Sequence, residues 1–236
     1  MLTVLALDTA TEFCSVALAH GGQLKDQHVE MPRAHNRHIL NMIDAVLGDH
    51  ALSEIDLIAC GIGPGSFTGL RIGCSVAQGL AWSLDLPVYG QCSLALQALS
   101  AQAAPDSTIE AGDWVLSTID AQINQLYWRW FRCVGDTLEA MSEPMISPAS
   151  SIVGVPDEGR IAVIGSGCHY QDALQTRFPR PVQWQPAARP RAAVIAQALQ
   201  SATLDDLPIM SATALLPRYV QQDIGWKKLA EQGPRD

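Results

Sequence analysis

The sequence has few positive charges and no long apolar run. Its 15 Lys and Arg residues, of which three are Lys, are outnumbered by 24 Asp and Glu, and the formal net charge is −9. Phosphate contacts depend mainly on Lys and Arg, so this composition disfavours a direct RNA binder, and a role on RNA would need a more basic partner. No stretch approaches the roughly 20 apolar residues of a membrane span. The opening MLTVLALDTATEF lacks the cationic start of a signal peptide, and we expect a cytoplasmic protein.

The sequence also lacks the usual metal-binding spacings. Its six cysteines are scattered without a CxxC or CxxH pair, which favours small core residues of a reducing compartment over disulfides or metal ligands. His35 and His38 are three residues apart near a predicted helix start, but neither HExxH nor HxxxH occurs and no third ligand is nearby. We interpret them as solvated or capping histidines and predict no metal site.

What the sequence does have is enough apolar material for a substantial core, at 48% hydrophobic and 17% charged residues. Hydrophobic periodicity predicts strands near 2–7, 13–18, 23–29, 55–62, 87–90, 114–119, 125–133, 137–141 and 161–165. It predicts helices near 36–51, 70–84, 93–103, 168–177 and 191–201. We expect an α/β protein of two lobes, residues 1–104 and 105–236, with a tail after Pro217 that is at best partly ordered.

The strongest local motif is GIGPGSFTGLRIG, residues 61–73, between a predicted strand and a predicted helix. Its backbone amides could face an anion through Gly63, Gly65, Ser66 and Thr68. It matches neither the Walker loop nor the dinucleotide fingerprint, and Ser66 does not stand in a GxSxG elbow. The alternative is a rigid, packed turn in which Ser66 or Thr68 caps the helix.

Two aspartates end predicted strands. Asp8 is followed by Thr9, which could place a carboxylate and a hydroxyl at a phosphate or metal, but the turn has no glycine and a turn-capping role is the alternative. Asp120 is followed by Ala121 and Gln122, again without glycine, which favours a structural role.

Aromatic residues cluster with two arginines in YWRWFR, residues 127–132, which superficially resembles a stacking platform for nucleic acid. In a strand, Trp128 and Trp130 would face one side and Phe131 the other, so a sheet covered on both faces explains the run better.

The segments LTVLALDTATEFCSVAL and IACGIGPGSFTGLRIGCSVAQGLAWSLDLPVYG, with HNRHILNMIDAVL between them, resemble the TsaB (YeaZ) family of tRNA threonylcarbamoyladenosine biosynthesis proteins. The resemblance is strong over residues 1 to about 100 and fades beyond Gly167. It implies the two-lobed actin-like ATPase (sugar kinase/heat-shock) fold. It also implies a non-catalytic subunit that binds and activates a catalytic paralogue, TsaD, together with the ATPase TsaE, and that forms a homodimer in isolation.

In the family, the helices near 36–51 and 69–84 make these contacts. The resemblance assigns the contacts here to the apolar and small residues of both helices: His38, Ile39, Met42, Ile43, Val46, Leu70, Gly73, Cys74 and Ala77. We expect an added charge at Met42 or Ala77 to disrupt partner binding.

The departures from the family pattern concern two arginines. The usual Asp-Ala-Arg reads Asp120, Ala121, Gln122, and the usual Tyr-Leu-Arg reads Tyr219, Val220, Gln221. The HxxxH pair of the catalytic paralogue is also missing, and the turns after Asp8 and Asp120 lack the glycines of phosphate turns. The resemblance therefore implies a degenerate nucleotide site, with ATP or ADP at a lobe or subunit interface as the ligand. The alternative function is an independent hydrolase, either a weak ATPase or a glycoprotease-like peptidase.

Overall fold

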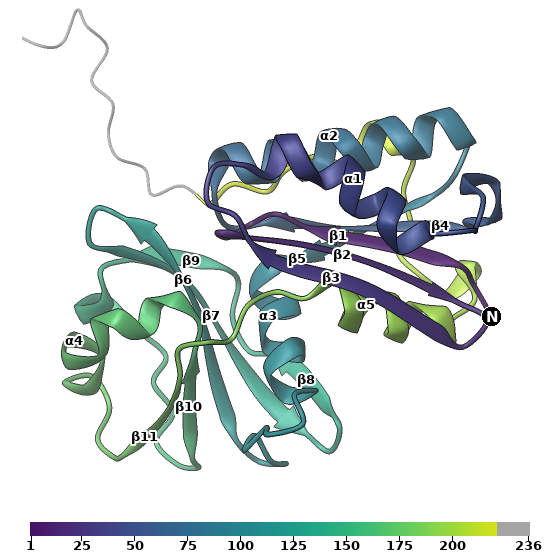
Figure 1. Cartoon of the computed structure of the whole chain (residues 1–236). Helices are drawn as coiled ribbons and strands as arrows, with labels where there is room; N and C mark the ends of the chain where they lie inside the picture. The colour runs from purple at the N-terminus through teal and green to yellow at the C-terminus, as the bar shows by residue number, and fades with distance from the viewer. Residues whose placement is uncertain (221–236) are drawn as a thin grey trace, which may run out of the picture.

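The computed structural model describes residues 1–220, which form two sheets flanked by helices (Figure 1). The first sheet has the order β3-β2-β1-β4-β5, with β1, β2 and β3 antiparallel and β1, β4 and β5 parallel. Its strands are β1 (Val4–Asp8), β2 (Phe13–His20), β3 (Gln23–Glu30), β4 (Leu57–Gly63) and β5 (Val88–Cys92). The apolar runs of β1 and β4 are buried on both faces, as central parallel strands require, whereas β3 is a polar edge strand.

The second sheet repeats this arrangement. Its order is β11-β10-β6-β7-β8, so β6, β7 and β8 are antiparallel while β6, β10 and β11 are parallel, and β9 adds to β7. The strands are β6 (Trp114–Gln122), β7 (Gln125–Val134), β8 (Thr137–Ala140), β9 (Met145–Ser147), β10 (Ile161–Ile164) and β11 (Val182–Gln185). The two lobes therefore have the same topology, and the predicted α/β fold class is confirmed.

Helices cover both faces of the first sheet (Figure 1). They are α1 (His35–Leu47) and α2 (Phe67–Leu84) on one face, with α5 (Ala192–Gln200) and the start of α3 (Ser93–Gln102) on the other. The apolar stripe of α1 packs with α2 on Leu5, Leu7 and Val16, and α5 packs on Val4 and Ala6. Burial of these stripes is the main stabilising contribution to the lobe.

Helix α3 joins the two lobes. Leu96 belongs to the first core, whereas Ala98 and Ala101 pack with Phe131 in the second. The buried Gln97 amide donates to the Ser117 hydroxyl at 2.9 Å and to the Thr118 carbonyl at 3.1 Å.

The chain crosses between the lobes twice. The strands of the first sheet end before residue 104 and those of the second begin after it, but α5 returns to the first sheet, where the Ala192 N–H donates to the Ser15 hydroxyl at 2.9 Å. Met210 then pairs with Val88 beside β5. Residues from 192–215 thus pack against the first lobe, although they follow the strands of the second in the chain.

Most predicted elements occur within a few residues of their expected bounds. The helix expected at 168–177 is instead a 3-10 turn followed by the short α4 (Gln171–Gln175), and β9 and β11 were not predicted because both are short and weakly patterned. That 3-10 turn is η3 (Ser166–Tyr170), and the others among the described residues are η1 (Leu52–Glu54), η2 (Ala149–Ser151), η4 (Leu204–Asp206) and η5 (Ala212–Ala214). Most of the tail discussed above lies outside the described residues. Among the described helices, none combines the length and apolar character needed to cross a bilayer.

Candidate functional site

A cleft of about 1150 Å³ lies between the lobes, next to the carboxyl ends of β1 and β6. The first lobe contributes residues 10–12, 32–36 and 65–69, which include the first residues of α1 and α2. The second lobe contributes residues 119–122, Tyr127 and Ser166. Ligands of α/β proteins commonly bind at such strand ends, so this cleft is the candidate site.

Asp8 and Thr9 form the turn that follows β1, beneath this cleft. The buried Asp8 carboxylate accepts the Ala10 N–H at 2.9 Å and the Ser93 hydroxyl at 2.9 Å. Burial raises the pKa of Asp8 to about 6, although both hydrogen bonds act in the opposite direction. Thr9 is fully buried and donates its hydroxyl to the Gly69 carbonyl at 2.7 Å. Asp8 thus caps its own turn, whereas the Thr9 hydroxyl ties this turn to the first turn of α2.

The glycines of the 61–73 loop allow it to pack against that turn. A Cβ atom at Gly61 would lie 1.8 Å from an Asp8 carboxylate oxygen, and one at Gly65 would lie 2.3 Å from the Ala10 carbonyl oxygen. Real Cβ atoms do not approach so closely, because overpacking forces the backbone apart. Gly63 is also buried, and its N–H donates to the Ser93 hydroxyl at 3.1 Å.

Several amides that a phosphate loop would present are already used within the protein. The Ser66 N–H donates to the Ala10 carbonyl at 2.7 Å, and the Gly69 N–H donates to the Ser66 hydroxyl at 3.2 Å. Ser66 is therefore the N-cap of α2, while Thr68 is exposed at the cleft. The geometry is that of a rigid, packed turn whose tip, Ser66 to Thr68, borders the cleft.

Asp120 lies on the opposite wall of the cleft and pairs with its own neighbours. Its carboxylate accepts the Gln122 backbone N–H at 2.9 Å and the Gln122 side-chain amide at 3.1 Å, and His169 lies 4.0 Å away. Gln122 therefore occupies both carboxylate oxygens, where the family pattern has an arginine. Gln122, Ile123 and Asn124 all have positive φ, and Ile123 is 93% exposed at the tip of the β6–β7 hairpin.

The two histidines of the predicted α1 start have different environments. His38 is exposed, whereas His35 is buried at the cleft and its Nε2 has no hydrogen-bond partner among the described residues. Half of the YWRWFR run is core, with Trp128 and Trp130 on one face of β7 and Phe131 on the other, as the alternation predicted.

The residues predicted to bind a partner lie mostly on the inner side of their helices. Met42 is only 4% exposed, and the other buried positions pack in the same way against the first sheet or its turns. They are Ile39, Ile43, Val46, Leu70, Gly73, Cys74 and Ala77, while His38 alone among the nine is exposed. The small residues let α2 approach the turn after β1, since a Cβ at Gly73 would lie 2.4 Å from the Thr9 hydroxyl.

The outer side of α1 and α2 is formed by other residues. Leu40 is 60% exposed and Phe67 is 55% exposed, and both line a groove of about 420 Å³ between the helices. The Arg71 guanidinium lies 3.7 Å from the Phe67 ring centroid and donates to the Tyr219 hydroxyl at 3.0 Å. Apolar residues outside the buried stripe of each helix, such as Leu40 and Phe67, indicate this face in the sequence. The predicted partner contacts were placed on the buried stripe instead.

The second departure from the family pattern, Gln221, lies outside the described residues.

Comparisons with known proteins agree with this fold. Residues 29–232 match the family model described as "TsaD: tRNA N6-adenosine threonylcarbamoyltransferase". A Haemophilus influenzae protein named tRNA threonylcarbamoyladenosine biosynthesis protein TsaB is 33% identical over 97% of this chain and 97% of its own length. The Escherichia coli protein of the same name is 38% identical over 61% of this chain and 64% of its own.

A solved structure titled "YeaZ from Pseudomonas aeruginosa" superposes with a TM-score of 0.82 at 32% identity, covering 93% of this chain and all of that one. The duplicated topology, the packed glycine loop and these matches lead to one conclusion. The chain belongs to the TsaB (YeaZ) family and has a two-lobed α/β fold whose two sheets share one topology.

Proposed function

We propose that this protein is a non-catalytic, activating subunit in the formation of tRNA N6-threonylcarbamoyladenosine in the cytoplasm. In this proposal it docks onto the catalytic paralogue TsaD, supports assembly with the ATPase TsaE, and meets tRNA only within that complex. The support for a pathway role is the name that its relatives carry. The support for a docking role is the exposed apolar face of α1 and α2.

That face is defined here as the docking face and consists of Leu40, Phe67, Arg71 and Tyr219. Its two large apolar side chains are more than half exposed, and its arginine is held in place by stacking and a hydrogen bond. Aromatic residues and arginines with restricted side chains are typical of interface centres, because little conformational entropy is lost when they bind. The same face would pair two copies of the chain when TsaD is absent.

The cleft supports the non-catalytic part of the proposal. Its main carboxylate, Asp120, is paired within its own hairpin, and Asp8 lies buried beneath the cleft as a turn cap. The described lining otherwise supplies hydroxyls, amides, Arg33, Glu12 in an ion pair with Arg189, and His35, whose Nε2 has no hydrogen-bond partner among the described residues. No nucleophile with an adjacent general base stands among these described residues, whereas hydrolysis needs such a pair or a metal.

The test compares two charge insertions at equally exposed positions. Leu40→Arg places an unpaired charge on the docking face, while Val153→Arg places one on the second lobe, where Val153 is 57% exposed. Binding to TsaD is measured by titration calorimetry, and the oligomeric state of the isolated chain by analytical ultracentrifugation. Leu40→Arg should weaken TsaD binding at least thirtyfold, about 2 kcal/mol, and give monomers, whereas Val153→Arg should leave both unchanged.

The catalytic question is answered in a reconstituted mixture of TsaD, TsaE, threonylcarbamoyl-adenylate and tRNA. We expect tRNA modification to require this chain and to fail with Leu40→Arg. Full modification without the chain would refute an activating role. ATP turnover by the chain alone, abolished by Asp8→Ala, would support the independent hydrolase instead.

A further inference from the structure

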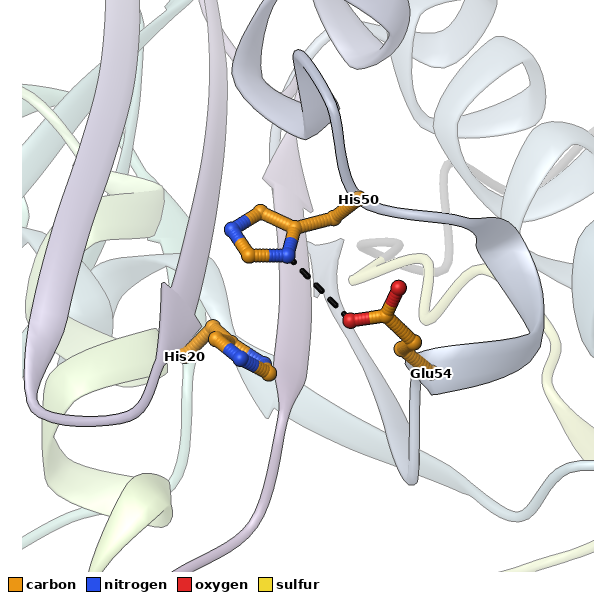
Figure 2. A group of neighbouring side chains, drawn as sticks. All are labelled: His20, His50 and Glu54. Carbon is orange, nitrogen blue, oxygen red and sulfur yellow. Dashed lines mark hydrogen bonds and ion pairs between the residues drawn. The ribbon is translucent and has the colours of Figure 1, made fainter.

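Three side chains converge at the end of the first lobe opposite the cleft. Figure 2 shows His20 at the end of β2, His50 in the turn after α1, and Glu54 in η1, with the three side chains directed toward one another. One nitrogen or oxygen of each lies within 4.8 Å of the others. His50 Nδ1 is 3.2 Å from Glu54 Oε2, and the two imidazole rings are 4.3 Å apart between centroids.

Neighbours hold two of the three side chains, His20 and Glu54. His20 Nδ1 is hydrogen-bonded to the Thr3 hydroxyl at 3.0 Å, and the Thr3 N–H donates to the Asp56 carboxylate at 2.7 Å. The Ala51 N–H donates to Glu54 Oε1 at 3.0 Å, which leaves Oε2 on the cluster side and lowers the pKa of Glu54. Such outer partners orient the histidine and carboxylate ligands of metal ions.

We propose that His20, His50 and Glu54 bind one zinc ion, or a similar late first-row divalent metal. Two imidazoles and one carboxylate are a known zinc ligand set, with the fourth position taken by water. Magnesium and calcium prefer oxygen-only sites and do not fit this donor set. Tetrahedral zinc requires ligand atoms about 3.3 Å apart, and rotation of these partly exposed side chains can close the present separations to that value.

The site lies away from the docking face and the cleft, so it is independent of the proposed function. Bound metal would tie the end of β2 to the connection between α1 and β4, where the His20 and His50 rings already pack together. Histidine spacing predicted no metal site, because His35 and His38 are the only pair close in sequence, whereas His20 and His50 are 30 residues apart. The spacing of four residues between His50 and Glu54 is the part of the proposed metal site that the sequence shows directly.

The experiment uses the full chain after chelator treatment and titrates it with Co²⁺, a spectroscopic substitute for Zn²⁺. We expect one equivalent, with the visible absorption of four- or five-coordinate cobalt and no thiolate charge-transfer band. Zn²⁺ should displace the cobalt and raise the midpoint of thermal unfolding, because a ligand that binds only the native state stabilises it.

Variants assign the ligands. His50→Ala and Glu54→Gln should each weaken metal binding at least tenfold, and Thr3→Val should weaken it while leaving the stoichiometry at one. His38→Ala removes an exposed histidine of the same lobe and should change nothing. Circular dichroism of the metal-free variants checks that each is folded. Absence of cobalt binding, or full affinity in folded His50→Ala, would overturn the proposal.

Discussion

The buried Asp8 carboxylate gives the sharpest stability prediction. Its pKa rises from 3.8 to about 6 through burial, and each pH unit corresponds to about 1.4 kcal/mol. Ionised Asp8 therefore lowers the free energy of unfolding by about 3 kcal/mol at neutral pH. The folded state binds the proton more tightly than the unfolded state, so this group's contribution is fully favourable below pH 4 and is lost as the pH rises to about 6.

Asp8→Asn removes the charge and keeps the shape of the side chain. The side-chain carbonyl of the introduced asparagine can still accept the Ala10 N–H, and its amide can donate to the Ser93 hydroxyl. We expect the variant to be more stable than wild type by about 1–3 kcal/mol at pH 7.5, with little gain at pH 4.5. Urea unfolding followed by circular dichroism at the two pH values measures both differences.

The control for this experiment is Asp26→Asn on the exposed edge strand β3, which should change stability by less than about 0.5 kcal/mol at either pH. If Asp8→Asn were less stable than wild type at pH 7.5, or equally shifted at both pH values, the desolvation argument would be refuted. The carboxylate would then contribute more through its two hydrogen bonds than it loses by burial.

Three further predictions concern packing and backbone strain. Gly69→Ala places a Cβ 2.0 Å from the Thr9 carbonyl oxygen and should destabilise the protein by about 1–3 kcal/mol. Gly79→Ala, on the same helix, has open space around the added Cβ and should stabilise the protein by about 0.5–1 kcal/mol. Chemical denaturation of the pair decides this, and equal effects would contradict the packing explanation. Ile123→Asn should raise the midpoint of thermal unfolding by about 2–4 °C, because asparagine tolerates the φ of 54° that costs isoleucine about 1 kcal/mol. An unchanged midpoint would mean that the hairpin tip carries no strain. Met42→Arg should unfold the protein, as circular dichroism would show, because a charge at this 4% exposed position costs about 3 kcal/mol or more. A folded variant that no longer binds a partner would make Met42 an interface residue, as the sequence predicted.

Local features were predictable from the sequence because they depend on nearby residues. The Ser66 cap and the packed turn follow from glycines between an apolar strand and a helical repeat. The alternation around Trp128 likewise placed its two faces in different cores. These are properties of segments a few residues long, where backbone geometry decides the outcome.

The orientation of α1 and α2 was not predictable in the same way. Small residues such as Gly73 and Ala77 suit a close contact, whether it is made with a partner helix or with the protein's own backbone. Periodicity identifies the apolar side of a helix but not what covers it. The structure places that side against the sheet and the turn after β1, and leaves Leu40 and Phe67 outside.

The return of α5 to the first lobe has a consequence for how the chain folds during synthesis. All described strands of the second sheet lie between residues 114 and 185, so this lobe can complete its core as soon as that continuous segment has emerged. All strands of the first sheet have been synthesised by residue 92, but the face of the sheet that carries Val4 and Ala6 is covered only when α5, residues 192–200, has been made. The first lobe to be made is thus the last to be finished, and a nascent chain that stalls near residue 190 exposes an apolar sheet face to aggregation.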